Sequence, residues 1–112
     1  TYNLLLGIYL KDFLALSPMF TTFYLLSVLP YPTAEYLNNE NYFHDYYTDI
    51  EISHAASVAH PKSAIQIRNR EMVDRADLVI CYIEHEKGGA WQTVEYAIKQ
   101  GKMVINLAVS NL

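Results

Sequence analysis

The strongest constraint on the fold is a pair of apolar runs separated by a glycine-containing loop and a helix. Residues 78–83 are apolar without interruption, and the polar loop after them ends at Gly88-Gly89. Residues 90–100 then repeat apolar side chains at helical spacing, before a second apolar run over 103–109. Continuous apolarity is typical of interior parallel strands, and a helical crossover between two such strands makes them parallel. The pattern predicts a strand–helix–strand unit with both strands buried.

The residues before this unit predict two further helices and a further strand. Pro61 suits the first turn of a helix over 61–76, whose apolar side chains fall on one face. Residues 3–16 are apolar nearly all round, which predicts a helix buried on more than one side. Residues 22–29 are β-branched and aromatic, which predicts an interior strand.

Together these elements predict one α/β domain over 1–112, with its core over 61–109. We expect three layers, in which the three strands lie parallel in one sheet and the two later helices pack on it. Residues 33–60 are rich in tyrosine and show no clear period, so we expect only a short helix near 34–37 and loops. Long segments of this kind are often functional lids.

Charge and cysteine content narrow the function classes. The chain of 112 residues has a net charge of −4, and its isoelectric point near 5.4 argues against a nucleic-acid interface built from lysine and arginine. The longest apolar stretches, 4–10 and 23–29, are shorter than the roughly 20 residues that cross a membrane, so we expect no membrane partner. Cys81 is the only cysteine and lies in an apolar run, as a buried thiol does. These features, with no recognisable export signal, predict a cytoplasmic protein.

The loop before residues 90–100 is the best candidate for a ligand site. Ligands of open α/β sheets lie beyond the carboxyl ends of the strands, where a loop leads into a helix, and Gly88-Gly89 lies at that place. Glycines let the backbone approach a ligand closely, and the amides at a helix start attract an anion. The alternative is an ordinary turn. Arg68 or Arg70 is a candidate to neutralise the anion and Glu95 to contact the ligand, although each also fits a solvated surface when considered alone.

A set of residues spread over 65–107 matches one family pattern. They are Arg68, Asn69, Met72, Val73, Asp74, Gly88, Gly89, Ala90, Thr93, Tyr96, Ala97, Gly101, Lys102, Val104, Ile105 and Asn106. The stretch resembles the SLOG superfamily, which joins the DNA-processing protein DprA to the Lonely Guy proteins, and the match is closer to its uncharacterised bacterial YpsA-like members. The resemblance implies a Rossmann-like fold and no settled activity. It also implies that the family's first strand and glycine-containing loop are missing here, so that the domain is truncated at its N-terminus.

The resemblance further implies a nucleotide or nucleotide-derived ligand, bound without a separate cofactor. The residues expected to contact it are Gly88, Gly89, Ala90, Trp91, Thr93 and Asn69. His85 lies in the same loop and is a candidate base near the ligand. A non-enzymatic module of this kind would bind its ligand as a sensor and pass the change to a partner.

Two enzymatic alternatives stay open beside the sensor. Lonely Guy phosphoribohydrolases have a catalytic arginine and glutamate, and by the resemblance Arg68 and Glu95 fall at those places. The match is incomplete, because Lys87 stands where that family has a proline and Asn69 where it has a lysine. The pattern is also similar to nucleoside 2-deoxyribosyltransferases, in which Glu95 would be the nucleophile that attacks the sugar. Both alternatives cleave an N-glycosidic bond.

Two remaining features concern metals and assembly. The tyrosine-rich segment contains a mixture of histidines and carboxylates, namely His44, Asp45, Asp49, Glu51, His54 and His60. Their irregular spacing offers no tetrahedral ligand set, so we predict no metal site. The helix expected over 3–16 is apolar on every side, and a chain this short cannot bury all of those sides. We therefore expect another copy of the chain to bury the remainder, which predicts a homo-oligomer.

Overall fold

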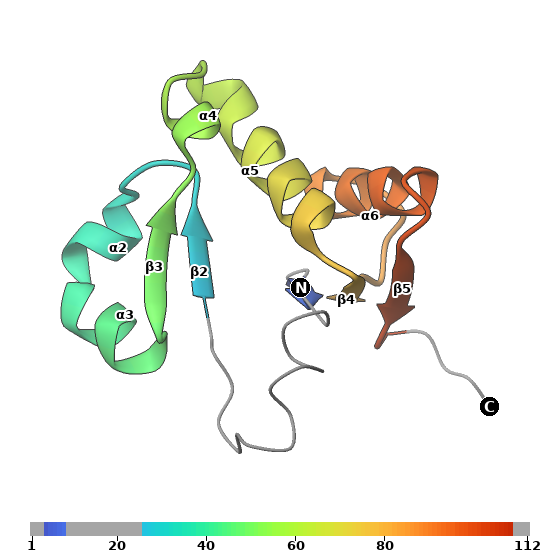
Figure 1. The fold of residues 1–112 in the computed structure, drawn as a ribbon, viewed down its shortest axis with the longest axis horizontal. Coiled ribbons are helices and arrows are strands. Elements are labelled where there is room, and N and C mark those ends of the chain that lie inside the picture. The colour runs from blue at the N-terminus through green and yellow to red at the C-terminus, as the bar shows by residue number, and fades with distance from the viewer. Residues whose placement is uncertain (1–3, 9–25, 109–112) are drawn as a thin grey trace. The chain divides into compact units, whose positions relative to one another are not determined.

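The computed structural model describes residues 4–8 and 26–108 of the chain. They belong to two compact units, one made of Thr1–Pro18 with Asn69–Leu112 and the other of Met19–Arg68. Each unit contains helices and a parallel strand pair, so the protein is of mixed α/β type (Figure 1). The single domain expected over 1–112 stays a prediction.

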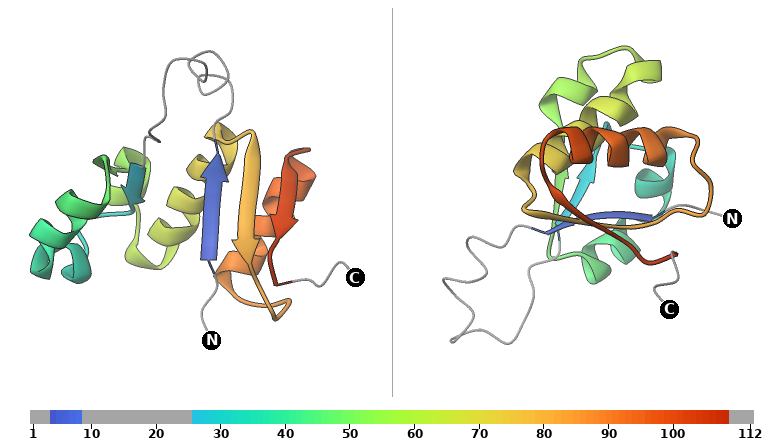
Figure 2. Two further views of the ribbon diagram at one scale, coloured as in Figure 1. Left: turned by 90° about the horizontal axis from the view of Figure 1, so that it is seen from below. Right: turned by 90° about the vertical axis from the view of Figure 1, so that its right-hand side faces the viewer.

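The first unit contains a three-stranded sheet. Its strands are β1 (Leu4–Ile8), β4 (Leu78–Tyr82) and β5 (Met103–Asn106), in the order β1–β4–β5. Strands β4 and β5 are parallel, whereas β1 runs antiparallel to β4. Figure 2 shows the three strands side by side, and helix α6 (Gly89–Lys99) connects β4 to β5. The predicted strand–helix–strand unit is confirmed.

One face of this sheet is covered by helices. Val73, near the end of helix α5 (Pro61–Arg75), packs with Val79 of β4 and Ala97 of α6 in a buried cluster. A second buried cluster joins Cys81 of β4 to Val94 of α6. Side chains two residues apart on a strand point to the same face, so the buried Val79 and Cys81 define the helix-covered face of β4.

The second unit is built on a pair of parallel strands. They are β2 (Leu26–Leu29) and β3 (Asp49–Ile52), and the chain between them forms helices α2 (Ala34–Asn38) and α3 (Glu40–Tyr46). Helix α4 (His54–Ser57) follows β3, and α5 then begins at Pro61. The side-chain oxygens of Thr33 and Ser53 accept backbone hydrogen bonds at the starts of α2 and α4. Such N-caps stabilise helices too short to persist on their own.

The helix predicted over 3–16 is wrong where the structure describes it. Leu4–Ile8 is a strand, hydrogen-bonded to β4, and residues 9–16 lie outside the described residues. A short run that is apolar on every side has no period that separates helix from strand. The free edge of β4 supplies the backbone partners that decide between the two. The homo-oligomer was expected because of this helix, so it stays a prediction without that support.

The single sheet of three parallel strands is also wrong. β2 pairs with β3 in a two-stranded sheet, whereas β4 and β5 pair with each other and with β1. β3 was not predicted because its four residues, Asp-Ile-Glu-Ile, are too few and too acidic to stand out among loops. Part of the predicted strand over 22–29 is confirmed at Leu26–Leu29, and its first residues lie outside the described range.

The described helices and side chains bear on the expected absence of membrane and metal contacts. Among the described helices, none combines the length and the apolarity needed to cross a membrane. In the same part of the chain, no three side chains of histidine, cysteine, aspartate or glutamate gather in a way that could hold a metal ion.

Candidate functional site

The turn between β4 and α6 requires a glycine at one position. Gly88 is the N-cap of α6 and has φ 90° and ψ −179°, in the region that side-chain-bearing residues rarely adopt. A Cβ built at Gly88 would meet no atom within 4 Å, so the requirement is conformational rather than steric. The same open space means that the backbone at Gly88 is accessible to a ligand.

The start of α6 is not capped by any side chain of the described residues. The first amide paired within the helix is that of Gln92, which donates to the Gly88 carbonyl at 3.1 Å. An α-helix leaves the amides of its first turn without intrahelical acceptors, and the helix dipole adds partial positive charge there. Ala90 and Trp91 lie in that turn. The geometry favours an anionic group beside it.

A chain of hydrogen bonds holds this turn from inside the unit. The Asn69 side-chain amide donates to the Thr93 hydroxyl at 3.1 Å, and that hydroxyl donates to the Gly89 carbonyl at 3.0 Å. Both side chains are buried, Thr93 completely. Asn69 comes from α5, so this chain of bonds joins α5 to the first turn of α6. In this geometry both residues position the glycines, and their expected contact with a ligand stays a prediction.

Asn106 fixes the other side of the loop. Its side-chain oxygen accepts from the Ile83 amide at 3.0 Å, and its side-chain nitrogen donates to the Ile83 carbonyl at 2.9 Å. The amide of Leu107 donates to the Cys81 carbonyl at 2.8 Å, next to this pair. The Asn106 side chain therefore makes with Ile83 the two hydrogen bonds that a neighbouring strand would make, at the point where β4 ends and the loop begins. Sequence reasoning did not place Asn106 in the site, although an asparagine ending an apolar strand is the signal that would have found it.

An open groove of about 480 Å³ begins at the first turn of α6. Trp91, Val94 and Ile98 line it from α6, and Val104 and Asn106 line it from β5. Its remaining lining residues are Ile83, Glu84, Glu86 and Lys102. The groove therefore combines an aromatic residue and aliphatic residues with three charged ones.

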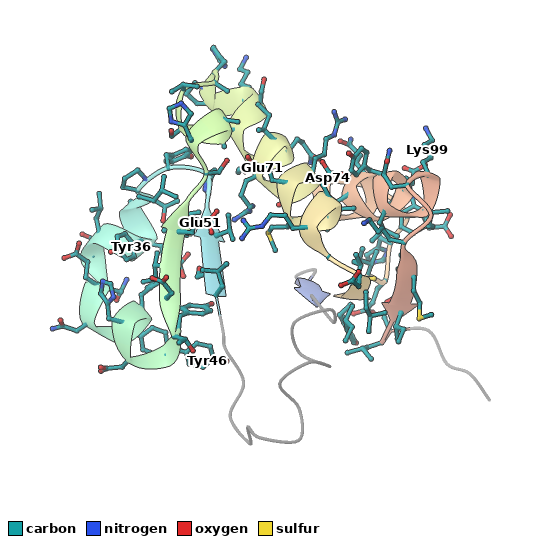
Figure 3. All side chains as sticks on the ribbon, viewed as in Figure 1. Tyr36, Tyr46, Glu51, Glu71, Asp74 and Lys99 are labelled. Atoms are coloured by element: carbon teal, nitrogen blue, oxygen red, sulfur yellow. The ribbon has the colours of Figure 1, made fainter. Side chains whose placement is uncertain are left out.

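Glu95 faces away from the core of the unit. Thr93, Val94 and Ala97 form the buried face of α6, whereas Glu95 and Lys99 are exposed (Figure 3 labels Lys99). Glu95 is absent from the residues that line the groove. A carboxylate nucleophile is activated by removal from water, and the exposed position of Glu95 does not provide this.

Arg68 is described with the other unit, of which it is the last residue. Its guanidinium donates to the carbonyl of Val28 in β2 at 2.7 Å, and burial lowers the pKa of the Arg68 guanidinium. One role of Arg68 is therefore structural, because its guanidinium provides a hydrogen bond for a backbone carbonyl in the buried part of β2. Its predicted contact with a bound anion stays a prediction.

His85 lies in the exposed loop that precedes the glycines. The His85 carbonyl accepts from the Lys87 amide at 2.8 Å, which tightens the loop into a turn. The His85 side chain is exposed. Its role as a base stays a prediction.

A polar contact on the outside of α6 joins the same two helices. The Tyr96 hydroxyl donates to the carboxylate of Asp74 at 2.6 Å, and the Arg70 guanidinium lies 5.4 Å from the centre of the Tyr96 ring. Asp74 lies near the end of α5 (Figure 3). The hydrogen bond to Asp74 is the main reason that the pKa of Tyr96 is raised; slight burial and the charge of Asp74 act in the same direction, and Arg70 opposes them.

Comparison with known proteins assigns no family to this geometry. No protein-family model, no curated protein and no solved structure matches the chain. The likeness to the SLOG superfamily therefore stays a prediction from the residues themselves.

Proposed function

We propose that the protein is a ligand-binding module that holds a nucleotide or nucleotide-derived molecule at the start of α6. The observation that carries this proposal is Gly88, which adopts φ 90° in open space at the uncapped first turn of α6. The backbone amides of that turn would donate hydrogen bonds to the anionic group of the ligand. The internal bonds of Asn69 and Thr93 would keep the turn in place whether or not a ligand is bound.

The groove beside this turn suits the remainder of such a ligand. The Trp91 ring offers a flat apolar surface on which a base can stack. The carboxylates of Glu84 and Glu86 are acceptors for sugar hydroxyls, and they would repel a phosphate placed among them. The phosphate would therefore lie at the helix start and the base in the groove.

A Rossmann-like three-layer fold is the finer form of this proposal. Its support is the parallel pair of β4 and β5, joined by α6, with the glycine turn at the carboxyl end of β4. Ligands of such folds lie at that end of the strands. The resemblance of residues 65–107 to the SLOG superfamily and a cytoplasmic location belong to the same proposal.

The sensor is preferred to an enzyme because of where Glu95 lies. Its exposed side chain outside the groove gives neither the desolvation nor the contact that a nucleophile needs. Incubation of the protein with nucleoside monophosphates, followed by chromatography, tests this preference. We expect no release of free base. Release that Glu95→Gln abolishes would establish the N-glycosidic enzyme instead.

Binding can be followed through Trp91, the single tryptophan of the chain. We expect its fluorescence to change as AMP, GMP or UMP is titrated, because the ring lines the groove. Gly88→Ala should weaken this binding about tenfold, since it strains the turn that presents the amides.

Gly101→Ala is the matched control. Gly101 also has a positive φ, 75°, with no atom within 4 Å of a built Cβ, but it follows the opposite end of α6. Both substitutions place a side chain at a positive φ, and only Gly88 belongs to the proposed site. Equal loss of binding in the two variants, or no response of Trp91 to any of the nucleotides, would contradict the proposal.

A further inference from the structure

The surface of α2 and α3 carries aromatic side chains that the core of its unit does not use. The rings of Tyr42 and Tyr46 stack with their centres 6.0 Å apart and their planes 12° apart. They are 65% and 59% exposed, whereas Phe43 on the same helix is buried. Phe43 makes the inward contact, an edge-on approach to Tyr36 of α2. Figure 3 shows Tyr36 on α2 and Tyr46 at the end of α3.

The same segment has an unusually one-sided charge. Residues 33–60 contain five carboxylates and no lysine or arginine, although the whole chain has a net charge of only −4. The carboxylates are those of Glu35, Glu40, Asp45, Asp49 and Glu51. Glu40 and Asp45 belong to α3 itself, and both are exposed. Two of the five carboxylates therefore lie on the same helix as the stacked tyrosines.

An open hollow of about 420 Å³ lies where α2 meets α3. The ring of Tyr42 and the carboxylate of Glu40 line it, together with three asparagines and Leu37. Its lining is mostly polar and contains no cationic side chain. Amide and carboxylate oxygens beside an exposed ring form a suitable environment for an ammonium or guanidinium group.

We propose that this acidic tyrosine face, defined by Glu40, Tyr42, Asp45 and Tyr46, docks a lysine- or arginine-rich segment of a partner protein. A guanidinium would lie over the tyrosine rings while Glu40 and Asp45 supply the opposite charge. A second copy of the same face is repelled by like charge, and so is a nucleic acid. The proposal is independent of the nucleotide site, because it uses only residues of the other unit.

Fluorescence anisotropy of a labelled peptide of alternating arginine and glycine tests the proposal on the full chain. We expect the peptide to bind, and a peptide of alternating glutamate and glycine not to bind. The double variant Tyr42→Ala with Tyr46→Ala should weaken binding about five- to thirtyfold, since two cation–π contacts are lost. The variant with phenylalanine at both positions keeps the rings, and binding should be retained to within about twofold.

A charge-matched control separates this face from general attraction by an acidic protein. Glu40→Gln with Asp45→Asn removes two charges from the face, and Glu84→Gln with Glu86→Gln removes two from the other unit. Only the first pair should weaken peptide binding strongly, and circular dichroism should show that both variants fold. Equal weakening by the two pairs, binding of the acidic peptide, or no effect of the tyrosine-to-alanine double variant would overturn the proposal.

Discussion

The region from β4 to β5 and the tyrosine-rich segment over 33–60 are both attached to parallel strand pairs, but they are stabilised differently. In the first, the buried face of α6 closes over β4, and apolar side chains of helix and strand interlock. In the second, α2 has no buried residue and α3 has only Phe43. Aromatic contacts and N-caps take the place of a continuous apolar face there. The difference shows that apolar periodicity in the sequence predicts the elements of the first region. The second region has no such periodicity, so its elements are not predicted from the sequence.

Phe43→Ala should produce the largest effect, because Phe43 is the one buried residue of α3. We expect a loss of about 3 kcal/mol in the free energy of unfolding of that region, measured by circular dichroism in urea. Tyr42→Ala, at an exposed position of the same helix, should change it by about 0.5 kcal/mol or less. Trp91 fluorescence reports the other unit and should keep its midpoint. If the Trp91 midpoint falls as far as the circular dichroism midpoint, the two regions unfold together and the contrast between them fails.

Val79→Ala removes buried apolar volume from the interlocked region. Val79 is 1% exposed and lies in the cluster that joins α5, β4 and α6. We expect a loss of about 2 kcal/mol, from two buried methyl groups and the cavity that they leave. The unfolding midpoint of Trp91 fluorescence should shift accordingly. Val58→Ala, at a 71% exposed position, is the control and should leave every midpoint nearly unchanged.

Thr93→Val tests the hydrogen bonds that hold the glycine turn. The substitution keeps the shape of the side chain but leaves the buried amide of Asn69 without this acceptor. We expect a cost of about 1 to 2 kcal/mol, because a buried hydrogen bond is lost. Thr93→Ser keeps the hydroxyl and should cost less. A Thr93→Val protein as stable as the Thr93→Ser protein would show that packing alone positions the turn.

Tyr96 should show the smallest effect, visible only in alkali. Its pKa is raised above 10.0, mainly by the hydrogen bond to Asp74. A raised pKa means that the folded state favours the protonated phenol, so this stabilisation is complete below pH 10 and is lost as the pH rises through the folded value. Ultraviolet titration of the phenolate should show a late-titrating component that Tyr96→Phe removes. Asp74→Asn should lower the pKa of Tyr96 towards its ordinary value; an unchanged pKa would mean that the contact is not formed in solution.

The candidate site was predictable in position but not in the direction of its side chains. The glycine turn between β4 and α6 follows from local sequence, because an apolar strand, two glycines and a helix permit few arrangements. Sequence alone did not separate Thr93, which is buried and points at Gly89, from Glu95, which is exposed two residues later. That distinction depends on which face of α6 meets β4 and α5.

The sequence by itself determined β4, α5, α6 and β5, and the parallel pairing of β4 with β5. These elements carry their own periodicity and end signals, so each is specified by residues within it. Only the tertiary structure decided that Leu4–Ile8 is a strand and that β2 pairs with β3. A strand forms backbone hydrogen bonds with a partner strand that lies far along the chain. A pattern of four or five residues does not identify that partner.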